Sequence, residues 1–311
     1  MATNIINRTD LGGLIPEPVT REIIQGAVER SAVLSMGRRL PNMTSKTQTL
    51  NVLDALPIAY FVDGDTGFKQ TSKMAWDKKK IHAEEIAVII PIPEAVLDDS
   101  DYDIWGEIRP RIVEAFGKKI DGAILFGIDK PSTWRNDILT TATAANSVVT
   151  ATSDMYQDIY GVNGVFAKVE NSGYDVNGIM AGVSTKAKLR SLVDTTGRPL
   201  FTADLHTANN YTLDGTAMTF PMNGAFDQSQ ALMIAGDFSQ LTYAIRQDVT
   251  YKLLTEATIV DPSTHEIVYS LAQQDMVALR AVMRLGWEIP NPINAFNEKL
   301  TNPCPFAVYK P

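Results

Sequence analysis

Large apolar side chains recur every four residues from Ile104 to Ile124, which is the period of one face of an α-helix. The pattern predicts a helix of about 25 residues, roughly 38 Å long at 1.5 Å per residue. We expect Asp101 or Asp103 to cap its start and Gly127 to end it. Pro110 lies inside the pattern, where it should kink the helix or mark the start of its regular part.

A second long element is predicted by the strict alternation of side chains from Met276 to Glu288. At roughly 3.3 Å per residue this strand would run about 40 Å, close to the length of the helix. Equal lengths favour an elongated platform that both elements share. Shorter helices and strands are mixed along the remainder, which indicates the α+β class. They are a helix over 155–169 that Gly173 ends, a helix that Ser184 begins, and a buried strand over 231–235.

Residues 1–35 are interpreted as an arm. Thr20 is expected to cap a short helix that ends by Gly37 and carries apolar residues on one stripe. That stripe must find its cover elsewhere, because nothing nearby in the sequence can shelter it.

Side chains also alternate over 46–54 and over 80–92, and we interpret these segments as the strands of a long hairpin. The stretch between them is interpreted as polar, with a turn at 63–67 and several lysines after it. Such a ribbon has little apolar surface of its own, and an isolated two-stranded ribbon is marginally stable in water. We therefore expect it to lie on its own body or on a neighbouring copy.

The composition excludes several classes of protein. The 311 residues include 28 basic and 36 acidic side chains, and the net charge of −8 has the wrong sign for a protein that mainly grips nucleic acid. One cysteine and three histidines cannot form an intrachain disulfide or a Cys/His metal cage, so we predict no metal and no cofactor. We expect no membrane span and no secretory signal, and hence synthesis in a cytoplasm.

The standard catalytic motifs are absent from the sequence, and the local alternatives are weak. The acidic turn around Asp63 and Asp65 is better explained by turn chemistry than by a cation. His82 with Glu84 and Glu85 is interpreted as a solvated strand face, and Cys304 as a packed or surface cysteine. The lysines at 78–80 are interpreted as a solvated strand end, with docking to a carboxylate-rich partner as the alternative. We predict that the protein is not an enzyme.

Several short stretches, in this order, resemble the major capsid proteins of tailed bacteriophages, which have the HK97-type fold. They are Ile-Pro-Glu-Ala-Val-Leu-Asp-Asp-Ser at 92–100, Asp-Gly-Ala-Ile-Leu-Phe-Gly at 121–127, the helix from Ser184 with Gly197, Arg198 and Phe201, Ala-Gly-Asp-Phe at 235–238, and Arg280 to Phe296. The resemblance extends over most of the chain.

The resemblance implies a long spine helix, an extended β-hairpin (the E-loop), a peripheral P-domain and an axial A-domain. The corresponding ranges are 1–35 for the N-terminal arm, 46–90 for the E-loop, 36–45, 91–133 and 241–285 for the P-domain, and 134–240 and 286–311 for the A-domain. By analogy, copies would form the pentamers and hexamers of an icosahedral head around double-stranded DNA, assembled in the bacterial host cytoplasm. A portal protein would be a partner.

The resemblance also raises the question of what locks the shell. Met1 directly precedes the arm, so we expect a separate scaffold protein or none. Some members cross-link an E-loop lysine with help from a glutamate on the long strand, but no acid lies between Met276 and Gly286. We predict non-covalent locking, with a decoration protein as a further partner. The residues expected at intersubunit contacts are Ile23, Ile24, Val28, Gly64, Asp65, Lys69, Lys73 and Trp105, core packing being the competing interpretation for Trp105.

Three alternatives stay open at this point. An encapsulin-type nanocompartment shares the fold and would enclose enzyme cargo in place of DNA. A phage tail or tube subunit would form helical assemblies. A small-molecule enzyme would be a discrete monomer or dimer.

Overall fold

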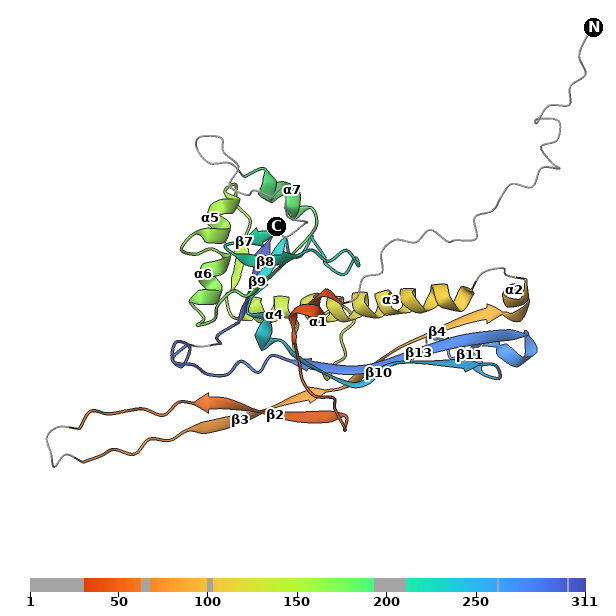
Figure 1. Cartoon of the computed structure of the whole chain (residues 1–311), viewed down its shortest axis with the longest axis horizontal. Coiled ribbons are helices and arrows are strands. Elements are labelled where there is room, and N and C mark those ends of the chain that lie inside the picture. The colour runs from red at the N-terminus through yellow and green to blue at the C-terminus, as the bar shows by residue number, and fades with distance from the viewer. Residues whose placement is uncertain (1–30, 63–67, 100–102, 193–210, 262, 301) are drawn as a thin grey trace, which may run out of the picture.

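The computed structural model describes residues 31–62, 68–99, 103–192, 211–261, 263–300 and 302–311. A long helix, α3 (Ile104–Phe126), lies over a four-stranded sheet and runs along its length (Figure 1). The strand order in this sheet is β1 (Arg38–Arg39), β10 (Thr242–Leu254), β13 (Met276–Glu288) and β4 (Glu84–Pro93). A short helix, α2 (Glu94–Asp98), follows β4 at the far end of this platform.

The spine helix α3 begins and ends where the sequence predicts. The Asp103 side chain accepts a hydrogen bond from the Gly106 amide at 3.0 Å, and Gly127 closes the helix with a φ of 69°. Glycine suits that left-handed conformation because it has no Cβ. The helix is continuous through Pro110, and its buried residues begin at Ile112. Its second half therefore lies in the centre of the molecule.

The long strand β13 has the predicted bounds, and it is largely buried on both faces. It pairs antiparallel with β10 on one side and with β4 on the other, where Met276 lies opposite Pro93 and Leu285 opposite Glu84. The face carrying Leu279 packs in the same apolar cluster as the spine helix. Near its other end, a Cβ added at Gly286 would collide with the His82 carbonyl, so the hairpin strand passes directly over this glycine.

The hairpin consists of β2 (Thr47–Ala55) and β3 (Ala75–His82), paired antiparallel. The expected second strand over 80–92 is therefore wrong in part, since Ala83 interrupts the strand and the residues from Glu84 onwards pair with β13. The alternation continues through this break because both segments are extended, so the period alone does not mark a change of partner. Figure 1 shows the hairpin projecting beyond the body on the side opposite α2.

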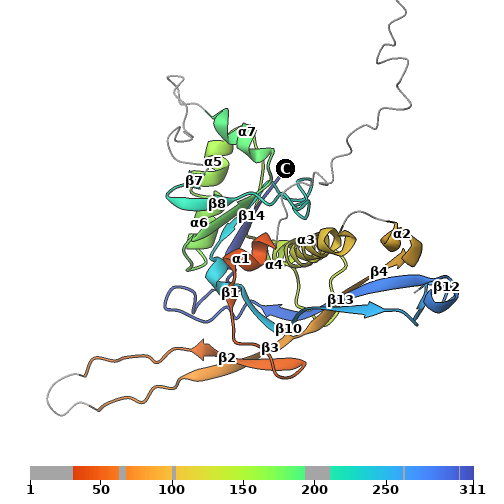
Figure 2. The ribbon, with the colours of Figure 1, turned by 45° about the vertical axis from the view of Figure 1, so that its right-hand side comes forward.

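A second sheet of six strands lies above one end of the platform (Figure 2). Its order is β5 (Val148–Thr150), β14 (Phe306–Lys310), β9 (Met233–Gly236), β6 (Gly178–Ala181), β8 (Thr216–Thr219) and β7 (Thr212–Leu213). The surrounding helices are α4 (Ile138–Ala144), α5 (Met155–Tyr160), α6 (Val165–Glu170) and α7 (Thr185–Arg190). Strands β6 and β9 are buried throughout, and they form the centre of this unit.

The helix expected over 155–169 is wrong, because the structure has two helices there. Gly161 ends α5 in an extended conformation, and Gly164 precedes α6. Glycine disfavours a helix interior because it loses the most backbone freedom there, so the break forms although the apolar spacing continues across it. The buried strand expected over 231–235 is confirmed as β9, and the helix after Ser184 is α7. The motif residues Gly197, Arg198 and Phe201 lie outside the described residues.

The remaining elements are small. They are α1 (Ala32–Met36), β11 (Thr258–Val260), β12 (Ile267–Ser270) and the 3₁₀ turns Phe238–Gln240 and Leu271–Gln273. Helix α1 contacts the spine helix, while β11 and β12 form a separate two-stranded ribbon near the α2 end of the platform.

Candidate intersubunit surfaces

The distal half of the hairpin carries large apolar side chains that the subunit does not cover. Strand pairing ends at Ala55 and Ala75, and the Ile58 amide donates a hydrogen bond to the Ser72 hydroxyl at 2.6 Å beyond that point. Phe61 and Phe68 are fully exposed, at 108% and 97% of their reference areas. Other exposed apolar residues on the hairpin are Ile58, Tyr60, Val62, Met74 and Trp76. We call this set, with Phe61 and Phe68, the hairpin patch.

The hairpin patch corrects our expectation that the stretch between the two strands is polar and has little apolar surface. The signal is present in the sequence, because residues 56–62 read Leu-Pro-Ile-Ala-Tyr-Phe-Val, in which the Tyr60 hydroxyl is the only polar side-chain group. A run of this kind is ordinarily buried in a monomeric protein, and a contiguous exposed patch marks an interaction surface. The apolar residues beside the tip are therefore candidates for a subunit contact.

The predicted contact residues at the tip have different outcomes. Lys69 and Lys73 are exposed, and neither forms an ion pair with another side chain in the described ranges. Gly64 and Asp65 lie outside the described residues. The assignment of these four residues to subunit contacts stays a prediction.

The root of the hairpin rests on its own body. Ile81 is fully buried in a small cluster with Met43, Ala83 and Ala244. The edge of β2 is also held, because the Ile293 amide donates a 3.1 Å hydrogen bond to the Leu53 carbonyl. One half of the hairpin is thus fixed to the subunit, whereas the half that carries the hairpin patch extends from it.

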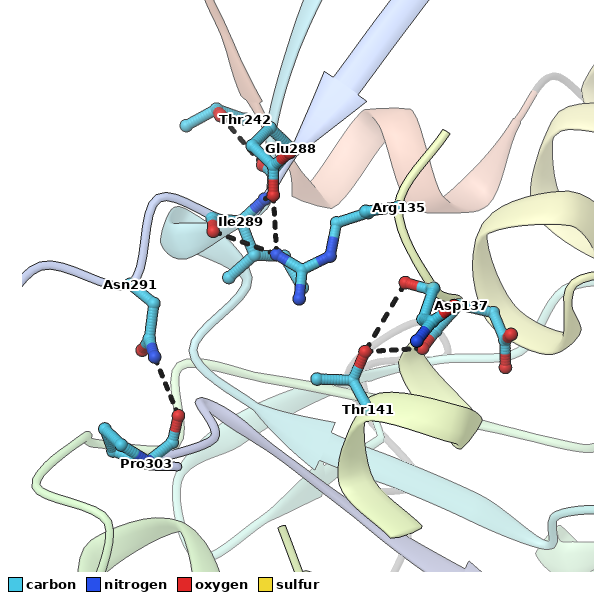
Figure 3. A network of polar contacts seen from close by, with 9 residues as sticks. Arg135, Asp137, Thr141, Thr242, Glu288, Ile289, Asn291 and Pro303 are labelled. Carbon is cyan, nitrogen blue, oxygen red and sulfur yellow. Dashed lines mark hydrogen bonds and ion pairs between the residues drawn. The ribbon is translucent and has the colours of Figure 1, made fainter. Parts of the chain in front are cut away.

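A polar junction, centred on Arg135 and Glu288, lies where the end of β13 and the loop after α3 meet (Figure 3). Arg135 donates to the Glu288 carboxylate at 2.7 Å and to the Ile289 carbonyl at 2.9 Å. Nearby, the Trp134 indole donates to the His82 carbonyl at 3.1 Å. Burial, with the charge of Arg135, lowers the pKa of Lys79 on the facing hairpin strand. Lys79, Arg135 and Glu288 thus form one charge cluster at the hairpin root.

Trp105 lies near the start of the spine helix, and it is half-buried against the main apolar cluster. Its place in a subunit contact stays a prediction, because its packing onto the subunit's own core is already visible. The arm residues Ile23, Ile24 and Val28 lie outside the described residues. The chain is described from Ser31, whose hydroxyl donates to the buried Asp121 carboxylate of the spine helix.

The side chains weighed for catalysis have structural partners. Glu85 pairs with Arg284 at 2.6 Å across β4 and β13, and Glu84 lies 3.4 Å from the ammonium group of Lys46. Cys304 is fully buried, and burial raises the pKa of its thiol, which disfavours the thiolate.

No group of three metal-ligating side chains occurs within the described ranges. None of the helices found there is both long and apolar enough to cross a bilayer.

The architecture is that of a shell-forming subunit, with a long helix over a long sheet, a second sheet at one end and a projecting hairpin. Comparison with known proteins agrees with this class. The family model for the phage capsid family matches residues 12–297. The major capsid protein of Staphylococcus phage 80alpha is 27% identical over 288 residues, covering 92% of this chain and 85% of that protein.

Solved structures give the same result. A chain from Microbacterium phage Oxtober96 is 34% identical with a TM-score of 0.84, and one from Mycobacterium phage Cain is 31% identical with a TM-score of 0.84. Each alignment covers 99% of this chain and at least 98% of the other. A gene transfer agent (GTA) capsid chain at 20% identity and a TM-score of 0.68 shares the fold. This chain belongs to the phage capsid family and is an HK97-like major capsid protein, a structural part of a virion.

Proposed function

We propose that copies of this subunit form the pentamers and hexamers of an icosahedral head, and that the hairpin patch is buried against neighbouring copies in that shell. The observation that supports this most strongly is the full exposure of Phe61 and Phe68 on a ribbon whose root is fixed. Burying apolar area yields about 25 cal/mol per Å², so two exposed phenylalanines are a substantial driving force for association. Several such contacts per subunit add together in a closed shell.

The division into parts belongs to the same proposal. Residues 1–35 act as the arm, 36–45, 91–133 and 241–285 as the P-domain, and 134–240 with 286–311 as the A-domain. The pairing of β14 (Phe306–Lys310) with β9 and β5 supports grouping the C-terminal stretch with the A-domain. The hairpin range is shortened to 46–82, because β4 belongs to the platform sheet.

The further partners are also proposals. We infer that the shell encloses double-stranded DNA and that a portal protein occupies one vertex. Assembly uses either a separate scaffold protein or none, and a decoration protein is a further partner of the shell. Assembly takes place in the cytoplasm of the bacterial host. The subunit has no catalytic role, and non-covalent contacts lock the shell.

Substitution of the two exposed phenylalanines tests the proposal. Phe61→Ser with Phe68→Ser should leave the melting temperature of the dissociated subunit unchanged within about 2 °C, because neither ring packs on its own subunit. Closed shells seen by negative-stain electron microscopy should disappear. Thr71→Ser, a conservative change at an exposed position of the same hairpin, is the matched control and should assemble normally.

The contents and shape of the particles separate the alternatives. Nuclease-resistant DNA inside closed particles purified from infected cells supports a head, whereas enzyme cargo without DNA supports a nanocompartment. Helical tubes would indicate a tail subunit. Normal shells from the doubly substituted protein would refute the role of the hairpin patch.

A further inference from the structure

The Asp121 carboxylate connects three segments that are distant in the sequence. Its Oδ1 atom accepts hydrogen bonds from the Ser31 hydroxyl at 2.5 Å and from the Val33 amide at 3.2 Å. Its Oδ2 atom accepts from the Ala32 amide at 2.9 Å and from the Asn223 side-chain amide at 2.7 Å. The residue is fully buried on the spine helix. Three of its four donors therefore come from the point at which the described chain begins.

These bonds hold helix α1 (Ala32–Met36) in place. Five residues are too few to form a stable helix alone, so α1 depends on contacts with the rest of the subunit. Asp121 accepts the first two amides of the helix, and the Ser31 hydroxyl accepts the Leu34 amide at 3.0 Å. Val33, fully buried, supplies the apolar contact. The amides that a helix start leaves unpaired are thus satisfied largely by a side chain 88 or more residues away.

The electrostatics of the buried carboxylate oppose release of this attachment. The donors to Asp121 are neutral, and no ion pair to its carboxylate occurs among the described residues. Lys119, two residues before it on the spine helix, pairs with Asp129 instead. A buried carboxylate without its donors is strongly unfavourable, so losing the arm root would leave the charge with one donor in place of four.

We propose that Asp121 is the positioning residue that fixes residues 31–35, the root of the N-terminal arm, to the spine helix. The role in assembly depends on the proposed function, in which the arm contacts neighbouring copies. The anchor itself does not depend on it, because it is a property of the single subunit.

Hydrogen–deuterium exchange on the full-length chain tests the anchor. Asp121→Asn keeps the shape but replaces one acceptor oxygen by an NH₂ group, which in either orientation faces the Ala32 or the Val33 amide, so at least one of these backbone amides loses its acceptor. Amides of residues 32–34 should then exchange about tenfold faster or more, the factor expected for the loss of one hydrogen bond. Ser31→Ala leaves the carboxylate but removes one of its donors and also the acceptor of the Leu34 amide. If Asp121→Asn does not fold, this variant should speed exchange of the Ala32 and Val33 amides, which still bond to Asp121, by about threefold.

Asp158→Asn is the matched control. Asp158 is also a buried carboxylate, and it accepts from the Thr152 amide and hydroxyl and from the Tyr309 hydroxyl. This substitution should speed exchange around residues 152–160 and leave 31–37 unchanged. A purely global loss of stability would instead raise exchange in both regions for both variants.

The outcomes separate the anchor from the proposed function. Unchanged exchange at 32–34 in folded Asp121→Asn, or an equal rise in Asp158→Asn, would overturn the anchor. Faster exchange with normal closed shells under the electron microscope would support the anchor and refute the role of a fixed arm root in assembly. Faster exchange with defective shells supports both.

Discussion

The guanidinium group of Arg135 lies 2.7 Å from the carboxylate of Glu288, and it joins the loop after the spine helix to the last residue of β13. The same guanidinium donates to the Ile289 carbonyl and lies 5.9 Å from the centre of the Trp287 ring. The pair is mostly shielded, with 22% and 14% of the two side chains exposed. It therefore holds together the place where the platform meets the second sheet and the hairpin root.

Replacing Arg135 by methionine is expected to lower the free energy of unfolding by about 2–4 kcal/mol, because Glu288 loses the cation that is hydrogen-bonded to it while it stays shielded from water. Urea unfolding of the dissociated subunit measures this effect. Arg284→Met is the control, since its pair with Glu85 is 39% and 46% exposed and should contribute less than about 1 kcal/mol. Equal losses in the free energy of unfolding for the two variants would show that shielding from water does not strengthen the Arg135 pair.

Gly127→Ala should destabilise the subunit more than Gly215→Ala. Both glycines have positive φ, 69° and 76°, so both substitutions carry a backbone penalty of about 1 kcal/mol. A Cβ at Gly127 would in addition lie 2.7 Å from the Asp137 carboxylate, whereas nothing lies within 4 Å of a Cβ at Gly215. Thermal unfolding should show a clearly lower melting temperature for Gly127→Ala, and equal losses would contradict the steric argument.

The long elements were predictable because each follows a local rule. The four-residue spacing from Ile104 and the alternation from Met276 specify their own structure, and Gly127 ends the helix by its own conformational freedom. The pairing of Glu84–Pro93 was not predictable in this way, because an extended segment has the same period whichever strand it joins. The break at Gly161 was missed because apolar spacing outweighed a glycine within the pattern.

The sequence predicts where the candidate contact surface lies, but not that its exposed side chains are apolar. The turn residues and lysines pointed to a projecting hairpin, yet the exposed side chains beside the tip include Tyr60, Phe61 and Phe68. A single sequence does not say whether an apolar run is covered by its own chain, because burial depends on tertiary contacts. Asp121 was missed for the same reason, since its partners at 31–33 are far away in the sequence.

Trp105→Ala distinguishes core packing from a subunit contact. The side chain is half-buried against the main apolar cluster, so its removal should lower the free energy of unfolding by about 2 kcal/mol. Urea unfolding of the dissociated subunit provides the measurement. If the subunit keeps its stability while shells no longer close, the contact role predicted from the sequence is correct instead.

Asp121 and Asp158 should give opposite pH dependences of stability. Burial raises the pKa of Asp121 above its ordinary value of 3.8, although four hydrogen bonds oppose this. Burial also acts to raise the pKa of Asp158, but the bonds from Thr152 and Tyr309 outweigh it and the pKa is lowered.

The sign of each dependence follows from proton linkage. The folded state binds the Asp121 proton more tightly than the unfolded state, so the contribution of Asp121 to stability is fully present below about pH 3.8 and declines as the pH rises through the raised pKa. The contribution of Asp158 is present above about pH 3.8 and declines as the pH falls through the lowered pKa.

Urea unfolding between about pH 3 and pH 7 measures both effects. The stability difference between wild type and Asp121→Asn should shrink as the pH rises, whereas that between wild type and Asp158→Asn should grow. Slopes of the same sign would mean that hydrogen bonding, rather than burial, dominates at Asp121.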